Sequence, residues 1–264
     1  MPPLRVVTYN IHSCVGNDRK YDPARTLAVL KELDADIIAL QEVGGYPADG
    51  GEQIDFFAEQ LGMSAVSGLH LRRRRVQFGN ALLAKGEIHV TDQINLSVSR
   101  LEPRSAIDAV VETRNGNLRV IATHLGLLPR DRRRQIDLLA AVLQLRVMPL
   151  TVLMGDFNVF GRERKVLRRI GAPHPLPVLR SFPSRRPLMS LDRLWTLPNA
   201  NLLSLAVHRT PLSVVASDHL PLIAEIDPAV AEVAAEDSDD LPAGLPEPAE
   251  AWPARYLRWR KASQ

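Results

Sequence analysis

The chain has 264 residues, of which 45% are hydrophobic and 24% are charged, a composition typical of a globular protein with a sizeable core. No apolar run approaches the ~20 residues of a membrane-spanning helix, the first residues lack the pattern of a signal peptide, and the single Cys14 excludes an internal disulfide. We therefore expect a cytoplasmic protein. The formal net charge is +3, but residues 229–264 hold seven acids and four bases, so the rest carries +6 and favours polyanionic partners.

The first half of the chain predicts strands mixed with two helices. One helix is expected to start at Asp22-Pro23, which supply an N-cap and a first-turn proline, and another over roughly residues 52–61. Asn115-Gly116 predicts a two-residue hairpin turn. The expected strands of this half are residues 5–9, 36–43, 80–85, 104–112 and 118–125.

The second half predicts a helix over residues 132–145 and a short basic helix near 162–170. The expected strands of this half lie within residues 149–158, 191–197, 201–210 and 219–227. Hairpin-linked strands together with helix-separated strands favour one α/β domain, residues 1–228, with two packed mixed sheets and helices outside them. Residues 229–264, rich in Ala, Pro and acids, are expected to form a flexible tail that ends in a small aromatic and basic patch.

Polar residues recur at the ends of the apolar strands. A single acid at a strand end is usually a cap or a turn former, but a series of them is harder to explain in that way. If the strands lie side by side, their ends converge, and carboxylates beside histidines and amides make a site for a hard cation. The series comprises Asn10, Glu42, His124, Asp156, Asn158, Asp192, Asp218 and His219.

Two short motifs sharpen this expectation. In GDFN, residues two apart on a strand point to one face, so Asp156 and Asn158 are predicted to face one pocket. Gly155 permits a close backbone approach just before them. In SDHLP, Asp218 and His219 can share the site only if they lie in the turn before the last strand.

Taken in order along the chain, the motifs resemble those of the endonuclease/exonuclease/phosphatase superfamily, which has the DNase I-like fold. The resemblance covers residues 4–227 and implies a four-layer α/β/β/α sandwich with a Mg²⁺ or Mn²⁺ site at one edge. The motifs are TYNIH (8–12), LQEV (40–43), GNALL (79–83), EPRSA (102–106), THLGL (123–127), GDFN (155–158), LDRLW (191–195) and SDHLP (217–221).

The resemblance also implies roles for the residues that match. Glu42 looks like the main metal ligand, with Asn10 and Asp218 close to the cation. Asp156 looks like the residue that activates or positions the attacking water. The resemblance leaves open whether the site holds one metal ion or two.

Three further side chains would act on the phosphate. Asn158 and His124 would contact the scissile group. His219, oriented by Asp192, would stabilise the transition state or protonate the leaving oxygen. Phosphoryl transfer depends mostly on charge neutralisation and in-line positioning, which these roles supply.

Some positions depart from the family's pattern. His12 stands where the repair endonucleases carry an acid, which puts a second metal of their kind in doubt. Phe78 lies near the position where some nucleases have a tyrosine that contacts the phosphate, and a phenylalanine cannot make that hydrogen bond. The long DNA-gripping insertions of the repair enzymes are absent from the sequence. The residues expected to contact substrate are Arg104, His12, Asn80 and Arg185.

The sequence therefore predicts a metal-dependent phosphohydrolase, most simply a phosphodiesterase with nucleic acid as its substrate. The basic clusters at 72–75, 130–134, 162–169 and 185–186 fit phosphate contacts, although each alone reads as a solvated face. Phospholipid headgroup diesters come second, with weak contact of the tail to an anionic membrane, and small phosphomonoesters third. A catalytically silent binding module and a thiol hydrolase using Cys14 are remote alternatives, and no stable protein partner is expected.

Overall fold

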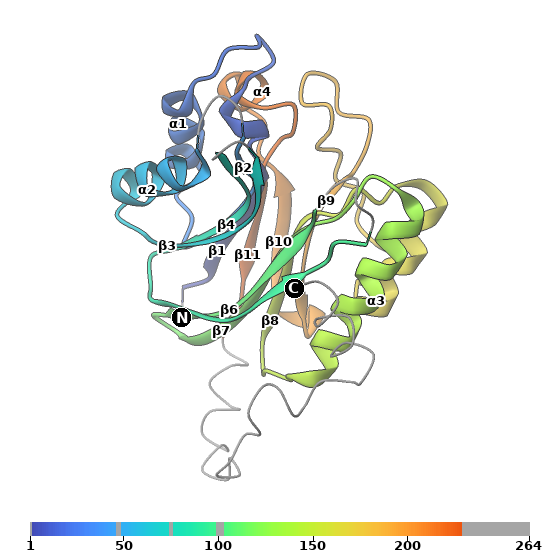
Figure 1. Cartoon of the computed structure of the whole chain (residues 1–264). Helices are drawn as coiled ribbons and strands as arrows, with labels where there is room; N and C mark the ends of the chain where they lie inside the picture. The colour runs from blue at the N-terminus through green and yellow to red at the C-terminus, as the bar shows by residue number, and fades with distance from the viewer. Residues whose placement is uncertain (1, 46–48, 74–75, 99–102, 229–264) are drawn as a thin grey trace.

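The structure, a computed structural model, describes residues 2–45, 49–73, 76–98 and 103–228. The described strands form two sheets (Figure 1). The six-stranded sheet has the order β10-β11-β1-β2-β4-β3, and the five-stranded sheet has the order β5-β6-β7-β8-β9. Each sheet is mixed, because β1 pairs with β2 and β7 with β8 in parallel among antiparallel neighbours.

The six-stranded sheet consists of β1 (Leu4–Asn10), β2 (Ile37–Gly44), β3 (Ser64–Arg73), β4 (Val76–Ala84), β10 (Leu202–Val207) and β11 (Leu222–Ile226). The five-stranded sheet consists of β5 (Ile88–Asn95), β6 (Ser105–Thr113), β7 (Gly116–His124), β8 (Thr151–Asp156) and β9 (Asp192–Leu197). The α-helices are α1 (Pro23–Leu33), α2 (Gly50–Leu61), α3 (Pro129–Leu145) and α4 (Pro211–Ala216). The 3₁₀ helices are η1 (His12–Cys14), η2 (Gly161–Ile170) and η3 (Asn199–Asn201).

Three clusters of buried apolar side chains build the layers. The central cluster joins the inner faces of the two sheets, for example Val6 of β1 and Val152 of β8. A second cluster packs α1 and α2 on the outer face of the first sheet, and a third packs α3 and η2 on the outer face of the second sheet. Figure 1 shows α1 and α2 on one side of the paired sheets and α3 on the other. The predicted α/β/β/α sandwich is confirmed.

The predicted elements are largely present, with informative differences. The helix after Asp22 begins as expected, because the Asp22 carboxylate accepts the backbone N–H of Arg25. The hairpin between β6 and β7 exists, but its two loop residues are Arg114 and Asn115, and Gly116 begins β7 with a φ of +101°. The predicted basic helix near 162–170 is the 3₁₀ helix η2.

Two strands, β3 and β5, and one α-helix, α4, were not predicted, and neither were the short 3₁₀ helices η1 and η3. Gly68 interrupts the apolar alternation of β3, and Asp92 breaks the alternation of β5 where its register against β6 shifts. The predicted tail, residues 229–264, lies outside the described residues. In the part of the chain that the structure describes, no helix is long and apolar enough to cross a membrane.

The register places the polar strand ends together. In the second sheet His124 pairs with Asp156, and Asp156 pairs with Asp192, across β7, β8 and β9. In the first sheet Asn10 ends β1 beside β2. A close approach of β7 and β8 supports this alignment: a side chain on Gly155 would lie 1.9 Å from the carbonyl oxygen of Thr123.

Candidate active site

A cavity of about 360 Å³ opens at this end of the sandwich. It combines acidic, basic and amide side chains with an apolar rim, as expected of a site that binds a charged group. Its lining residues are Glu42, Arg104, His124, Leu127, Arg132, Asp156, Asn158, Phe160, Phe182, Met189, Leu191, Asp218 and His219.

A bulge in β2 presents Glu42 to the cavity. The register of β2 against β4 shifts between Leu40 and Val43, and Glu42 takes a left-handed backbone with a φ of +56°. A non-glycine residue with positive φ is strained, and such strain is found mainly at functional sites. Bulges also redirect side chains next to active sites. The strained backbone at Glu42 thus directs its carboxylate into the cavity.

Asn10 links the two sheets through their carboxylates. Its side-chain Nδ2 donates to Glu42 Oε1 at 3.0 Å and to Asp156 Oδ2 at 3.2 Å. Its Oδ1 accepts the backbone N–H of His12 at 3.1 Å, which fixes the orientation of the amide. Asn10 thus lies between two acids of opposite sheets and reduces their mutual repulsion.

Asp156 is the most enclosed acid of the cavity, with 1% of its surface exposed. Its Oδ1 accepts the backbone N–H of Asn158 at 2.9 Å. Its Oδ2 lies 3.5 Å from His124 Nε2 and 3.7 Å from His219 Nε2. Burial, with a contribution from the Asp192 charge, raises the pKa of Asp156 to about 7, although His219 and the hydrogen bonds oppose this shift. A carboxylate with this pKa is suited to exchange a proton near neutral pH.

His219 is held from behind by a fully buried acid. Its Nδ1 lies 2.9 Å from Asp192 Oδ2, which also accepts the hydroxyl of Ser181 at 2.5 Å. Burial alone would lower the pKa of His219, but the Asp192 and Asp156 carboxylates raise it to about 10. The ring of Phe182 packs on the imidazole with 4.7 Å between centroids. The arrangement presents a cationic, oriented Nε2–H to the cavity.

His124 and Asn158 form a second polar pair. Asn158 Nδ2 lies 3.2 Å from His124 Nε2 and donates to the Leu125 carbonyl at 3.0 Å. The sequence placed Asn158 on the same strand face as Asp156, but this reason was wrong, because β8 ends at Asp156 and Asn158 has a left-handed φ of +53°. The tight turn, with its Asn158 N–H bonded back to Asp156, brings both side chains to the cavity.

The predicted position of Asp218 and His219 in the turn before β11 is confirmed. The Ser217 hydroxyl anchors this turn by donating to the Asn10 carbonyl at 2.7 Å, and it accepts the His219 N–H at 3.2 Å. Asp218 lines the cavity with about a third of its side chain exposed, 34%. It therefore adds a solvated carboxylate beside the enclosed Asp156.

The oxygen-rich donor set fits a hard divalent cation such as Mg²⁺ or Mn²⁺. Glu42 and Asp218 supply carboxylates to the cavity, with the Asn10 amide bonded to Glu42, and the only cysteine of the chain does not line it. The ligand atoms of Asp156, Asp192 and His219 also lie within 4.8 Å of one another. However, Asp192 is outside the lining and its Oδ2 already serves Ser181 and His219. The first set is thus better placed to hold an ion.

The structure does not bring every expected substrate contact to the cavity. Arg104 lines it with 4% of its surface exposed. Asn80 is buried and donates at 3.0 Å to a backbone carbonyl of β6, and Arg185 is exposed and donates at 3.2 Å to a carbonyl of the loop before α1. His12 lies behind Asp218, with 3.9 Å between Nδ1 and Oδ1. These three residues are absent from the lining.

Sequence reasoning missed Ser181, Phe182 and Phe160, and it named Arg132 only as a member of the basic cluster at 130–134. Ser181 and Phe182 fix the Asp192–His219 pair, and Phe160 and Arg132 line the cavity. None of them lies at the end of an apolar strand, where the search for functional residues was made. Phe160 was detectable only as an aromatic residue two positions after the GDFN motif.

Comparisons with known proteins identify the family and the fold of the chain. Residues 7–219 match the sequence model of the Endonuclease/Exonuclease/phosphatase family. A search of curated proteins found no match.

Three solved structures illustrate the likeness of fold. An endonuclease/exonuclease/phosphatase from Beutenbergia cavernae DSM 12333 is 21% identical, with a TM-score of 0.67 over 86% of this chain and 72% of that one. Truncated TDP2 from Caenorhabditis elegans is 19% identical, with a TM-score of 0.60 over 85% and 97% of the chains. Sphingomyelinase C from Streptomyces griseocarneus is 19% identical, with a TM-score of 0.63 over 86% and 100%.

Proposed function

The chain belongs to the Endonuclease/Exonuclease/phosphatase family, a family of phosphoester hydrolases, and from this premise we propose that it is a divalent-metal-dependent phosphodiesterase. One observation carries the proposal. The buried Asp156 lies within 3.7 Å of His219 Nε2 and is linked through Asn10 to the Glu42 carboxylate, all at one cavity. A base, an oriented cationic histidine and a cation-binding carboxylate are the groups that hydrolysis of a phosphodiester requires.

The side chains divide the work of in-line hydrolysis between them. Asp156, with a pKa near 7, accepts the proton of the attacking water. His219 faces the same cavity in its cationic form, held by Asp192, and it donates to the phosphoryl group or to the leaving oxygen. Because both groups are fixed by hydrogen bonds, little reorganisation accompanies the reaction.

Asn158, His124 and Arg104 are placed to hold the nonbridging oxygens of the phosphate. All three line the cavity and all are less than a tenth exposed, so their donors act away from bulk water. Glu42 and Asp218 would hold a divalent cation, with the Asn10 amide beside them. That cation, when bound, neutralises charge on the phosphate as it develops.

Nucleic acid is the substrate class that we favour. Residues 1–228 carry a formal charge of +6, and Arg104 and Arg132 line the cavity itself. A phospholipid headgroup diester is the second candidate. It is favoured by the likeness of fold to a sphingomyelinase C and by apolar rim residues such as Leu127, which is 64% exposed.

The test is hydrolysis of three diesters by the full-length protein in Mg²⁺, Mn²⁺ and EDTA. The substrates are bis-p-nitrophenyl phosphate, plasmid DNA and a phospholipid headgroup diester. We expect turnover that requires the cation, and the preferred natural substrate identifies the class. Cation-independent turnover, or no turnover of any diester in a protein that binds the cation, would contradict the proposal.

A further inference from the structure

The active-site cavity continues into two further hollows on one side. A cavity of about 320 Å³ shares Phe160 and Met189 with the active site. A larger cavity of about 560 Å³ shares Gly161, Arg164 and Val178 with the first. The three hollows thus adjoin one another, from the active-site cavity along η2.

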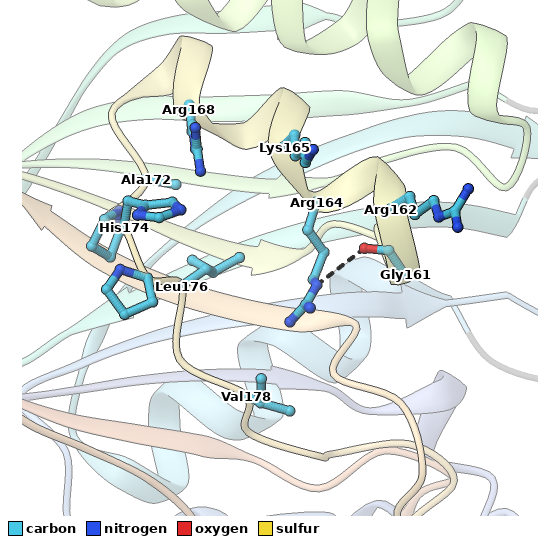
Figure 2. Close-up of a pocket in the computed structure, with 11 residues that line it drawn as sticks. Gly161, Arg162, Arg164, Lys165, Arg168, Ala172, His174, Leu176 and Val178 are labelled. Carbon is cyan, nitrogen blue, oxygen red and sulfur yellow. Dashed lines mark hydrogen bonds between the residues drawn. The ribbon is translucent and has the colours of Figure 1, made fainter.

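The two hollows beyond the active-site cavity are lined by cations and, among the described residues, by no acid. We call them the basic groove; its cationic lining consists of Arg162, Arg164, Lys165, Arg168, Arg180 and Arg193. Figure 2 shows Arg164 and Arg168 extending from η2 on the side of the loop that carries His174 and Val178. The side chains of one helix and of the loop that follows it therefore converge on one hollow.

The basic residues of η2 differ in their partners according to the direction they face. Arg169, outside the groove, pairs with Asp137 of α3 at 2.7 Å, and Glu163 pairs with the buried Arg132. No ion pair joins Arg164 or Arg168 to any acid among the residues that the structure describes. The only acid of η2 is turned towards α3, which leaves the groove side of the helix uniformly positive.

Arg193 strengthens this point because it is buried in the wall of the groove. It is 4% exposed, its Nη1 donates to the Pro177 carbonyl at 3.0 Å, and its Nε has no hydrogen-bond partner within the described part of the chain. Burial and the nearby charge of Arg164 lower the pKa of Arg193 to about 10, although Asp192 opposes them. A buried guanidinium without a carboxylate partner is unfavourable, and a bound anion would compensate it.

The length of the basic groove indicates that its ligand is a polymer and not a compact anion. Ten residues of 3₁₀ helix at ~2.0 Å each span about 20 Å, and the cations of η2 recur along this length. A headgroup or sugar phosphate would fill only the first hollow. Phe160 is 52% exposed at the junction with the active site, where an unpaired base could stack on its ring.

We propose that the basic groove binds a single strand of nucleic acid that continues from the active site. The phosphates nearest the scissile one would bind Arg164, Arg180 and Arg193, and more distant phosphates would bind Lys165 and Arg168. The inference rests on the proposed phosphodiesterase function and assigns its substrate. It also gives the basic segment 162–169 a role other than that of a solvated surface.

The test is fluorescence anisotropy of labelled oligothymidylates of 3 and 15 nucleotides with the full-length protein in EDTA, where no turnover interferes. In Arg164→Gln/Arg168→Gln we expect binding of the 15-mer to weaken about tenfold or more. The slope of log affinity against log salt should become less steep by about 1.4, since each lost phosphate contact on a single strand removes ~0.7. Lys165→Gln should show a smaller change in the same direction.

Arg169→Gln is the control, and the single variants Arg164→Gln and Arg168→Gln are compared with it directly, because each of the three removes one positive charge from η2 and only Arg169 lies outside the groove. Binding of the 15-mer by this control should stay within about twofold of wild type. If the double variant and the control bind the 15-mer with equal affinity, the proposed role of the basic groove is overturned. So would a 3-mer that binds as tightly as the 15-mer, or inositol hexakisphosphate that binds more tightly than either.

The two proposals fail separately. If the wild type hydrolyses bis-p-nitrophenyl phosphate but the double variant binds the 15-mer like the control, the hydrolase stands and the groove is wrong. If the wild type hydrolyses no diester but the double variant loses the 15-mer, the groove stands and the hydrolase is wrong.

Discussion

At the scale of single residues, the site depends on the pair formed by Asp192 and His219. Asp192 is fully buried, and its Oδ2 holds His219 Nδ1 at 2.9 Å. Without a carboxylate at this position, the imidazole would lose both its orientation and the charge that keeps it protonated. The orientation of His219 is thus set by a residue that does not itself line the cavity.

We expect Asp192→Asn to lower kcat by about 10²–10⁴-fold, the usual contribution of a positioned acid or base, with a smaller change in KM. The basic limb of the pH–rate profile should move to lower pH, because the carboxylate that raises the pKa of His219 is gone. Steady-state kinetics on bis-p-nitrophenyl phosphate checks both. Asp137→Asn, which neutralises an exposed acid on α3, should behave as wild type. An unaltered pH profile in Asp192→Asn would remove this positioning role.

Cys14 gives a second prediction at this scale. It is fully buried, and burial raises the pKa of its thiol to about 12. The native thiol should therefore react with dithionitrobenzoate at pH 8 at least ~100-fold more slowly than in denaturant. The thiol of the unfolded chain ionises near its ordinary pKa of ~8.5. The buried, protonated thiol therefore contributes to the free energy of unfolding below that pH, and this contribution is lost as pH rises towards 12. Fast native labelling would show that Cys14 is accessible.

The sequence predicted many of the polar residues that line the cavity, because strand ends are visible in a sequence. Asp156, Asp218 and His219 follow or precede apolar runs, and all three line the cavity. Ser181 and Phe182 could not be found in this way, since their contacts with Asp192 and His219 join segments whose approach only the fold determines.

At the scale of elements, the close approach of β7 and β8 aligns the site. Gly155 makes this approach possible: its φ is +148°, and an added Cβ would lie 1.9 Å from the Thr123 carbonyl oxygen. Neighbouring Asp156 and His124 are paired across the same two strands. A displacement of β8 from β7 would therefore move the base away from the histidine.

We expect Gly155→Ala to destabilise the protein by about 3 kcal/mol or more, through the backbone clash and the unfavourable φ together. Urea denaturation measures the change. Gly62→Ala is the matched control: this glycine also has a positive φ, +62°, but an added Cβ would meet nothing within 4 Å, so only about 1 kcal/mol should be lost. Equal losses in the two variants would contradict the account of strand packing.

Elements with a strong local signal were predicted, and those without one were missed. Asp22-Pro23 marks the start of α1, and the apolar run of β2 is buried along most of its length. By contrast β3 and β5 are weakly patterned and take their structure from pairing with β4 and β6. The left-handed turn of Asn158 and the bulge at Glu42 are tertiary effects without a signature in the local sequence.

At the scale of the whole molecule, the described residues pack into one domain. The three apolar clusters are made of residues between Leu4 and Ile226, and they join both sheets with their covering helices. The sequence indicated one α/β domain followed by a compositionally distinct tail, and the domain boundary remains a prediction.

A variant that ends at Pro228 should unfold within about 2 °C of the full-length protein, because none of the side chains in the clusters is removed. Thermal unfolding monitored by circular dichroism is the measurement. A variant with the acids of 232–250 changed to their amides controls for charge. A drop of ten degrees or more in the shortened chain would show that the tail packs on the body.

The measurement that tests the central claim most directly is Mn²⁺-dependent hydrolysis of bis-p-nitrophenyl phosphate by the wild type and Asp156→Asn side by side. The substitution keeps the shape of the side chain and removes the buried base. We expect the wild type to turn over only with the cation and the variant, folded by circular dichroism, to be about 10³-fold slower or more. A folded variant that retains activity within about tenfold of wild type would contradict the assignment of this cavity as the active site.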